Sequence, residues 1–304
     1  MAQPTLPGPL LDLTTDNITP NVVRISTQSG NARVNYLMER LITHLHDFAR
    51  ETRLSTTEWM AALDFLVRCG QMSSDLRHEF ILLSDVLALS LLVDSINHPK
   101  PPASTEGSNL APPCACTVSD TAGNPVSDVK VDIWETDSSG QYDVQHDHRE
   151  GPRERCIIVS DAKGKFWFKA VRPVSYAIPE DGPVGQLLKL LKRHCWRPAH
   201  MHFMFEKDGW DHLTTALYMR GDPYETSDAV FAVKRSLIVD LEKVDAATAA
   251  KYGVKEGTLL LKHDFVLVTQ KEADELRDRN AIQALRELGL SMKLVDHLPV
   301  PDLD

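Results

Sequence analysis

The apolar residues of this chain change their spacing across one proline-rich stretch, and that change limits the folds the chain can adopt. Before residue 98 they recur every three or four positions, which places them on one face of a helix. After residue 113 they alternate with polar residues and turn residues interrupt them often, as in short strands. The stretch 98–113 itself is rich in proline and small polar residues and is typical of a linker.

Three helices are predicted before the linker. Residues 33–50 carry a leucine-rich stripe along one face. The run Ser55-Thr56-Thr57-Glu58 matches a capping box and begins a second helix, which ends near Gly70. The third helix follows Ser73-Ser74 and is apolar on nearly every side. A helix of that kind is buried, either in a core or against another subunit.

Short strands are predicted beyond the linker. Two hairpins come first, at 116–134 and 157–168. Further strands follow at 200–205, 213–219 and 259–268, and a charged terminal helix at 272–288. The segment 230–239 is either one more strand or a short helix followed by a strand. Frequent turns between short strands are typical of a β-sandwich. We therefore predict an α+β protein, with a helical N-terminal domain over residues 1–103 and an antiparallel β-sandwich domain over residues 104–304.

Composition indicates which kinds of partner the protein binds and which cellular compartment it occupies. The formal net charge of -10 argues against a nucleic-acid-binding protein, because such binding needs Lys and Arg to neutralise phosphates. The five cysteines are scattered and odd in number, which does not indicate a disulfide framework. The N-terminus lacks the features of a secretory signal, and no uncharged apolar run reaches the ~18 residues of a membrane span. These features predict a cytoplasmic protein.

The predicted strand at 200–205 places two histidines on one face. His200 and His202 alternate with Met201 and Phe203, so both imidazoles can reach one metal ion. A lone pair of this kind also occurs in hydrogen-bonded cores and on surfaces. The pair alone therefore does not establish a metal site.

Other side chains leave further interpretations open. Cys195, with or without His194, could join His200 and His202 in the catalytic zinc site of a hydrolase. Tyr142 and Tyr176 lie beside a turn and between prolines. Taken alone, each tyrosine is interpreted as a partly buried residue whose hydroxyl forms a hydrogen bond with the backbone.

A longer block of residues is more specific than these single positions. It reads Ser175-Tyr176-Ala177-Ile178-Pro179-Glu180-Asp181-Gly182-Pro183-Val184-Gly185, then Arg193-His194, then Arg197-Pro198-Ala199-His200-Met201-His202. This block resembles the iron(III) intradiol ring-cleavage dioxygenases, and residues 131–142 and 213–224 resemble the same family. The resemblance runs from about residue 30 to the C-terminus. It is greatest to the fungal hydroxyquinol (benzene-1,2,4-triol) 1,2-dioxygenases.

The resemblance implies a site built on one non-haem Fe(III) ion per subunit. The two tyrosinate ligands of the family fall on Tyr142 and Tyr176, and its two histidine ligands fall on His200 and His202. Its active-site arginine, which stabilises negative charge on the substrate ring, falls on Arg197. Tyr176 is implied as a second catalytic residue, since it takes a proton from the substrate. Phenolate is a hard anionic donor, which suits Fe(III).

The implied reaction opens the ring of hydroxyquinol between adjacent hydroxyls with O2 and gives maleylacetate. Cleavage of catechol to cis,cis-muconate is the alternative. The expected substrate wall comprises Leu91 and Asp94 on the third helix, Pro112 in the linker, and Ala216. Asp94 could bond a third ring hydroxyl or lie in water at a helix end. Ala216 stands where catechol-preferring relatives often carry Gln, which favours hydroxyquinol.

The helices of the family form a dimerisation domain and line an apolar channel that can hold a lipid. The resemblance therefore implies a homodimer, with an aromatic diol or triol and O2 as small-molecule partners. One departure affects the expected activity. The run Leu110-Ala111-Pro112-Pro113 lacks the glycine, the aromatic residue and the longer segment usual in the family, and leads almost directly into Cys114. A weakly active or inactive iron-binding homologue therefore stays open.

Overall fold

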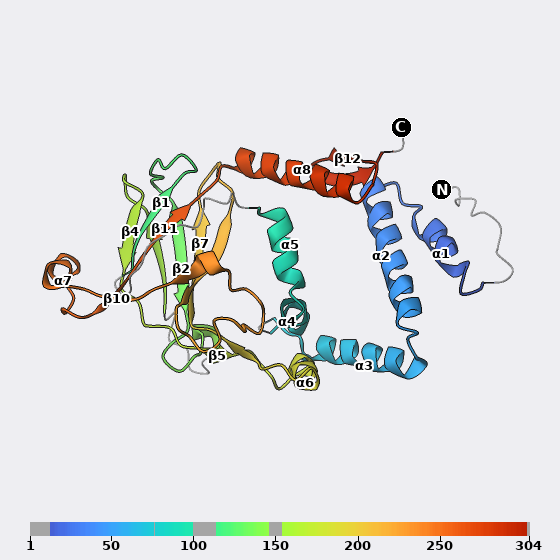
Figure 1. Ribbon diagram of the computed structural model, residues 1–304, viewed down its shortest axis with the longest axis horizontal. Helices are drawn as coiled ribbons and strands as arrows, with labels where there is room; N and C mark the ends of the chain where they lie inside the picture. The colour runs from blue at the N-terminus through green and yellow to red at the C-terminus, as the bar shows by residue number, and fades with distance from the viewer. Residues whose placement is uncertain (1–12, 76, 100–113, 146–153, 303–304) are drawn as a thin grey trace. The chain divides into compact units, whose positions relative to one another are not determined.

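The structure is a computed structural model that describes residues 13–75, 77–99, 114–145 and 154–302 (Figure 1). The chain divides into two compact units, one made of residues 1–67 with 274–304 and the other of residues 68–273. Most of the predicted linker, including Pro112, lies outside the described residues. None of the described helices is long and apolar enough to cross a membrane.

The first unit joins N-terminal helices to a C-terminal hairpin. Its elements are α1 (Ile18–Ser26), α2 (Ala32–Glu51), β12 (Met292–Val295) and β13 (Leu298–Pro301). The Asn31 side chain caps α2 by accepting a hydrogen bond from the Val34 amide at 3.1 Å. Arg33 Nη1 donates to the carbonyl oxygen of Pro299 at 2.8 Å and so ties α2 to the hairpin. The first predicted helix is therefore confirmed.

Two helices include the sequence positions at which one unit ends and the other begins. Helix α3 (Thr56–Met72) begins at the predicted capping box. The Ser55 amide donates to Glu58 Oε2 at 2.9 Å, and the Glu58 amide donates to Ser55 Oγ at 3.3 Å. Helix α8 (Gln270–Glu287) is the predicted charged terminal helix. Both predictions are confirmed.

The predicted third helix is in fact two helices, so that prediction of one continuous helix is wrong. Helix α4 (Glu79–Val86) and helix α5 (Leu89–Asn97) are separated at Ala88, whose φ of 57° lies in the left-handed region. A left-handed residue cannot continue a right-handed helix. Helix α5 holds no buried residue within the described chain. Burial of α5 in a core is therefore not seen among the described residues.

The second unit holds two sheets as separate layers (Figure 1). One has the strand order β3-β2-β7-β8-β9 and the other the order β10-β11-β1-β4. The strands are β1 (Cys114–Ser119), β2 (Lys130–Glu135), β3 (Arg155–Val159), β4 (Lys165–Phe168), β7 (His200–Glu206), β8 (Leu213–Met219), β9 (Ile238–Val239), β10 (Glu242–Lys243) and β11 (Leu259–Val266). The smaller elements are β5 (Tyr176–Ala177), β6 (Trp196–Arg197), α6 (Pro183–Leu190), α7 (Ala246–Tyr252), η1 (Asp143–Gln145) and η2 (Arg235–Leu237). The predicted β-sandwich is confirmed.

Two details of the strand prediction are wrong, namely the two hairpins and the antiparallel pairing throughout. The segments 116–134 and 157–168 are not hairpins, because each turn carries the chain from one sheet to the other. The segment 230–239 matches the second of its two predicted forms, since the short helix η2 is followed directly by the strand β9. Not every pair is antiparallel, since β1 pairs with β11 and β8 with β9 in parallel. Strand partners are set by contacts between distant segments, which local alternation does not reveal.

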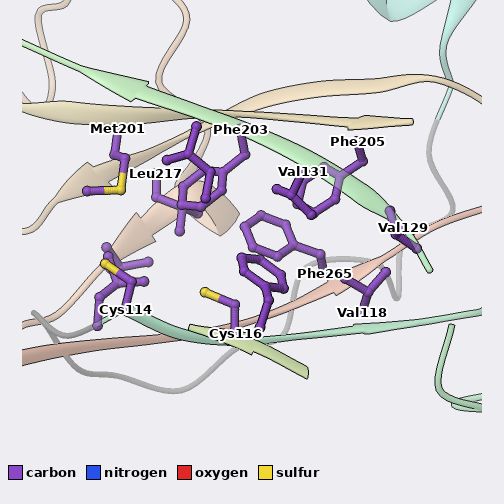
Figure 2. Close-up of a cluster of buried hydrophobic side chains, with 14 of the residues drawn as sticks. Cys114, Cys116, Val118, Val129, Val131, Met201, Phe203, Phe205, Leu217 and Phe265 are labelled. Carbon is purple, nitrogen blue, oxygen red and sulfur yellow. The ribbon is translucent and has the colours of Figure 1, made fainter. Parts of the chain in front are cut away.

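The hydrophobic core lies between the two sheets, and Figure 2 shows side chains from both layers pointing toward one another. Phe205 of β7 meets Phe265 of β11, with ring centroids 4.5 Å apart. Met201 and Phe203 of β7 lie in the same core. Since successive side chains of a strand point to opposite faces, the intervening histidines of β7 face away from this core.

Candidate metal centre

Separate elements bring the predicted metal ligands together. Strand β7 carries His200 and His202 on the face opposite the core. Tyr176 lies in the two-residue strand β5, where it is paired with Arg197 of β6. Tyr142 directly precedes the short helix η1. The candidate ligands therefore come from one strand of a large sheet, from a two-residue strand and from the residue before a short helix.

A turn shapes the segment before Tyr142. Asp137 Oδ1 accepts hydrogen bonds from the Ser139 amide at 2.8 Å and the Gln141 amide at 3.1 Å. Gly140 has a φ of 81°, and a Cβ atom there would lie 3.0 Å from the Cβ atom of Tyr176. Glycine therefore permits both the left-handed backbone and the close approach of the two tyrosine-bearing segments.

The four predicted donor atoms form a compact cluster. Tyr142 Oη lies 3.1 Å from Tyr176 Oη, 3.2 Å from His202 Nε2 and 3.5 Å from His200 Nε2. The two Nε2 atoms are 3.1 Å apart. Donors bound to one ion at about 2.1 Å with angles near 90° lie roughly 3 Å apart. The spacing of these oxygen and nitrogen atoms thus fits a single metal ion.

The alternative zinc set is not assembled. Cys195 is half-buried, and its Sγ contacts Glu180 Oε2 at 3.8 Å. In the described part of the chain, no group of three or more His, Cys, Asp or Glu side chains could hold a metal ion. The zinc-hydrolase interpretation, which needs Cys195 beside His200 and His202, is therefore wrong. The two phenol oxygens complete the candidate set.

The site keeps both imidazoles neutral, the form in which a ring nitrogen binds a metal. Burial, followed by the charge of Arg197, lowers the pKa of His202 to about 3 and the pKa of His200 well below its usual range. His200 Nδ1 lies 2.7 Å from the carbonyl oxygen of Pro198 and donates its proton there, which leaves the lone pair on Nε2. The Trp134 ring stacks on His202 at 4.8 Å, with the planes 9° apart.

Arg197 borders the cluster and is nearly buried. Its Nη1 donates to Tyr176 Oη at 3.1 Å and lies 3.3 Å from His200 Nε2. Its Nε donates to Asp228 Oδ1 at 3.1 Å, and its Nη2 donates to Tyr218 Oη at 3.3 Å. The guanidinium thus directs a fixed positive charge at the site, as the prediction for Arg197 requires.

Sequence reasoning missed the partners of these residues. Asp228 lies 31 positions from Arg197, and a pairing at that distance has no local signal. Tyr218 is opposite His200 in the β7–β8 register. It could have been found, because residues two apart on a strand share a face and Ala216 was already expected at the site. Trp134 likewise pairs with His202 across β2 and β7.

The residues predicted for the substrate wall lie in different places. Ala216 is buried and pairs with His202 across β7 and β8. Leu91 is half-buried on α5. Asp94, on the same helix, lines a cavity of about 140 Å³. Within the described chain, none of the four candidate ligands lines that cavity, and Pro112 lies outside the described residues.

Comparisons with known protein families define the class of the chain. Residues 31–105 match the family model described as the catechol dioxygenase N terminus. Residues 107–269 match the family model described as dioxygenase. Together with the helical and sheet-rich parts of the fold, these matches define an oxidoreductase that incorporates O2.

Individual relatives agree with this class. The intradiol ring-cleavage dioxygenase hqdA of Aspergillus niger is 60% identical, over 97% of each chain. The 6-chlorohydroxyquinol 1,2-dioxygenase of Cupriavidus pinatubonensis is 40% identical, over 83% of this chain and 96% of the relative. The crystal structure of hydroxyquinol 1,2-dioxygenase from Pseudomonas putida DLL-E4 matches with a TM-score of 0.77 and 35% identity, over 84% of this chain and 99% of that one. The chain belongs to the intradiol ring-cleavage dioxygenases, a family that implies non-haem iron.

Proposed function

We propose that the chain binds one Fe(III) ion per subunit through Tyr142, Tyr176, His200 and His202. The observation that carries the proposal is the spacing of 3.1–3.5 Å between neighbouring donor atoms. Hard phenolate oxygens with imidazole nitrogens suit this ion. When bound, the ion supplies Lewis-acid activation of an aromatic diol toward O2.

The proposed substrate is hydroxyquinol, whose ring opens between adjacent hydroxyls. One O2 is consumed, both of its atoms enter the product, and the product is maleylacetate. Relatives named 6-chlorohydroxyquinol and hydroxyquinol 1,2-dioxygenase support this choice, as does the small side chain of Ala216 beside His202. Catechol, which would give cis,cis-muconate, is the alternative substrate.

Tyr176 and Arg197 are the proposed catalytic residues. As the diol binds, Tyr176 Oη takes one of its hydroxyl protons. Arg197 Nη1 donates to that oxygen at 3.1 Å and can do so in either protonation state of the tyrosine. The same guanidinium stabilises negative charge that develops on the ring. Asp228 and Tyr218 keep it aimed at the site.

Asp94 is the proposed contact for the third ring hydroxyl, with Leu91 and Pro112 completing the wall. Its carboxylate can accept a hydrogen bond that catechol cannot donate. Asp94→Ala should therefore lower kcat/KM for hydroxyquinol by about tenfold, the value of one lost hydrogen bond, and leave kcat/KM for catechol unchanged. Equal losses for both substrates would remove Asp94 from substrate recognition.

The helical part is proposed as a dimerisation domain over residues 1–103, with the catalytic domain over 104–304. The two family matches, which end at 105 and begin at 107, support this division. Leu45 of α2 and Ile96 of α5 are 57% and 60% exposed. A second subunit covering such faces would give a homodimer with an apolar channel for a lipid. Sedimentation should give twice the 34.0 kDa chain mass, and a monomer would contradict the proposal.

Oxygen consumption and isotope labelling test the reaction directly. Iron-loaded protein should take up one O2 per hydroxyquinol, and isotopically labelled O2 should place both atoms in an acyclic product. We also propose that the reaction occurs in the cytoplasm, where the free cysteines stay reduced. Incorporation of a single oxygen atom, or equal turnover by zinc-loaded protein, would refute the proposed chemistry.

A second candidate is an iron-binding homologue with weak turnover. The alignment with the Aspergillus relative spans 320 positions, more than the 304 residues here, so that relative carries residues this chain lacks. If these residues complete the pocket, adding them after Pro113 should raise turnover and leave the iron content unchanged. Normal turnover by the chain as it stands would remove this candidate.

A further inference from the structure

Asp222 accepts hydrogen bonds from two segments that carry candidate ligands. Its Oδ2 accepts from the Ser175 hydroxyl at 2.6 Å and from the Ala199 amide at 2.9 Å. Ser175 directly precedes Tyr176, and Ala199 directly precedes His200. One carboxylate oxygen therefore links the segment of a proposed tyrosine ligand to the segment of a proposed histidine ligand.

The turn that carries Asp222 is held in place by its own contacts. Gly221 has a φ of 80°, and Asp222 Oδ1 accepts the Tyr224 amide at 2.9 Å. The Tyr224 ring stacks on Trp196, with centroids 5.4 Å apart and planes 5° apart. Both oxygens of the carboxylate are thus in use, and its orientation is defined from two sides.

Strand β5 provides little restraint of its own for Tyr176. It has two residues, and Tyr176 pairs with Arg197 and Ala177 with Trp196 of β6. One further backbone bond, from the Ile178 amide to the Cys195 carbonyl oxygen at 2.9 Å, continues this ladder. Such a short ladder is a weak anchor, whereas β7 lies inside a five-stranded sheet. Contacts outside the strands can therefore add to the restraint on the spacing between the two ligand segments. Hydrogen bonds to a carboxylate are about twice as strong as neutral ones, which suits Asp222 to that task.

We propose that Asp222 is a positioning residue that sets the separation of Tyr176 and His200 before a metal ion binds. It acts through Ser175 and Ala199 rather than by contact with the substrate or the metal. The inference rests on the proposed function of these ligands as an iron site. It predicts that loss of the Asp222 carboxylate loosens the ligand set while the sandwich stays folded.

The first experiment measures hydrogen exchange in the iron-free chain, on peptides that cover 174–178 and 198–202. In Asp222→Ala, exchange of both segments should rise at least tenfold, because Asp222 Oδ2 no longer holds the Ala199 amide. Asp222→Asn should be intermediate, since its carbonyl oxygen can still accept. Asp161→Ala is the matched control, because Asp161 Oδ1 also accepts two amides, in the turn between β3 and β4. It should leave both peptides unchanged.

The second experiment measures Fe(III) affinity and the visible phenolate-to-iron band. Loss of an outer contact of this kind typically weakens metal affinity by about 10–100-fold, which is the loss expected for Asp222→Ala. Ser175→Ala removes only the hydrogen bond from the Ser175 hydroxyl to Asp222, so its Fe(III) affinity should fall less than that of Asp222→Ala. The iron-free variants should keep the far-ultraviolet circular dichroism of the wild type.

The two experiments separate this inference from the proposed iron site. Unchanged exchange or unchanged iron affinity in Asp222→Ala would overturn the positioning role. Faster exchange in Asp222→Ala, combined with a wild-type protein that binds iron without a phenolate band, would support the restraint by Asp222 and refute Tyr176 as a ligand. Faster exchange with weaker iron binding and an altered band supports both.

Discussion

Replacing Glu135 by Gln tests the electrostatics of the site-bearing sheet. Glu135 ends β2, one position after Trp134, and is 5% exposed. Its Oε1 accepts the Val171 amide at 2.8 Å, and its buried Oε2 has no hydrogen-bond partner among the described residues. Burial, opposed by the Val171 bond and reinforced by the charge of Glu154, raises the pKa of Glu135 from 4.5 to about 8. Glutamine keeps the shape of the protonated acid and cannot ionise.

The size of the effect follows from the pKa of Glu135 in the unfolded chain, 4.5, and its pKa in the folded chain, about 8. Below pH 4.5 the folded and unfolded chains both hold the proton, and stability does not change. Between pH 4.5 and 8 only the folded chain holds it, so the free energy of unfolding falls by about 1.4 kcal/mol per pH unit. Above pH 8 both forms are ionised, and the accumulated loss is about 5 kcal/mol. In Glu135→Gln, which has no carboxyl group at this position, this fall in the free energy of unfolding should not occur.

Urea unfolding of the iron-free protein at pH 5 and pH 8.5 measures the difference. The free energy of unfolding of Glu135→Gln should exceed that of the wild type by more at pH 8.5 than at pH 5. Circular dichroism and fluorescence should be followed together, because a chain of two compact units can unfold in stages. Glu242→Gln on the exposed edge strand β10 is the control. Its free energy of unfolding should change with pH as that of the wild type does. A pH-independent offset for Glu135→Gln would refute the reasoning.

Three further substitutions probe the site and the core. Arg197→Lys should keep iron bound but lower kcat about 10²–10³-fold, because a lysine cannot reach Tyr176, Tyr218 and Asp228 at once; unchanged kcat would contradict its role. Trp134→Ala removes the ring stacked on His202 and should weaken iron binding about tenfold in a chelator competition, with Trp134→Phe retaining most of the affinity. Phe205→Ala should lower the free energy of unfolding by about 3–5 kcal/mol in urea, and a loss below about 1 kcal/mol would place Phe205 outside the core.

Local patterns predicted what depends on neighbours in the sequence. The alternation along β7 put Met201 and Phe203 in the core and both histidines on the other face, which the burial of that strand confirms. The capping box at Ser55 predicted the start of α3. In each case the contacts are made within a few residues, so the pattern carries the information.

Features that depend on distant contacts could not be predicted in this way. The break at Ala88 has no local cause in the sequence, since alanine favours a helix. The parallel pairing of β1 with β11 joins the first and the last strand of the sandwich in chain order. Tyr142 and Tyr176 entered the candidate site only through the family resemblance, because nothing in the spacing of two single tyrosines shows that their oxygens lie 3.1 Å apart.

The visible absorption spectrum of iron-loaded protein tests the central claim most directly. Phenolate bound to Fe(III) gives a charge-transfer band that colours a protein red to purple. The proposed site predicts this band in the wild type, a shift when hydroxyquinol is added without oxygen, and loss of part of the band in Tyr142→Phe. A colourless wild type that nevertheless binds one Fe(III) per subunit would contradict the assignment of Tyr142 and Tyr176 as ligands.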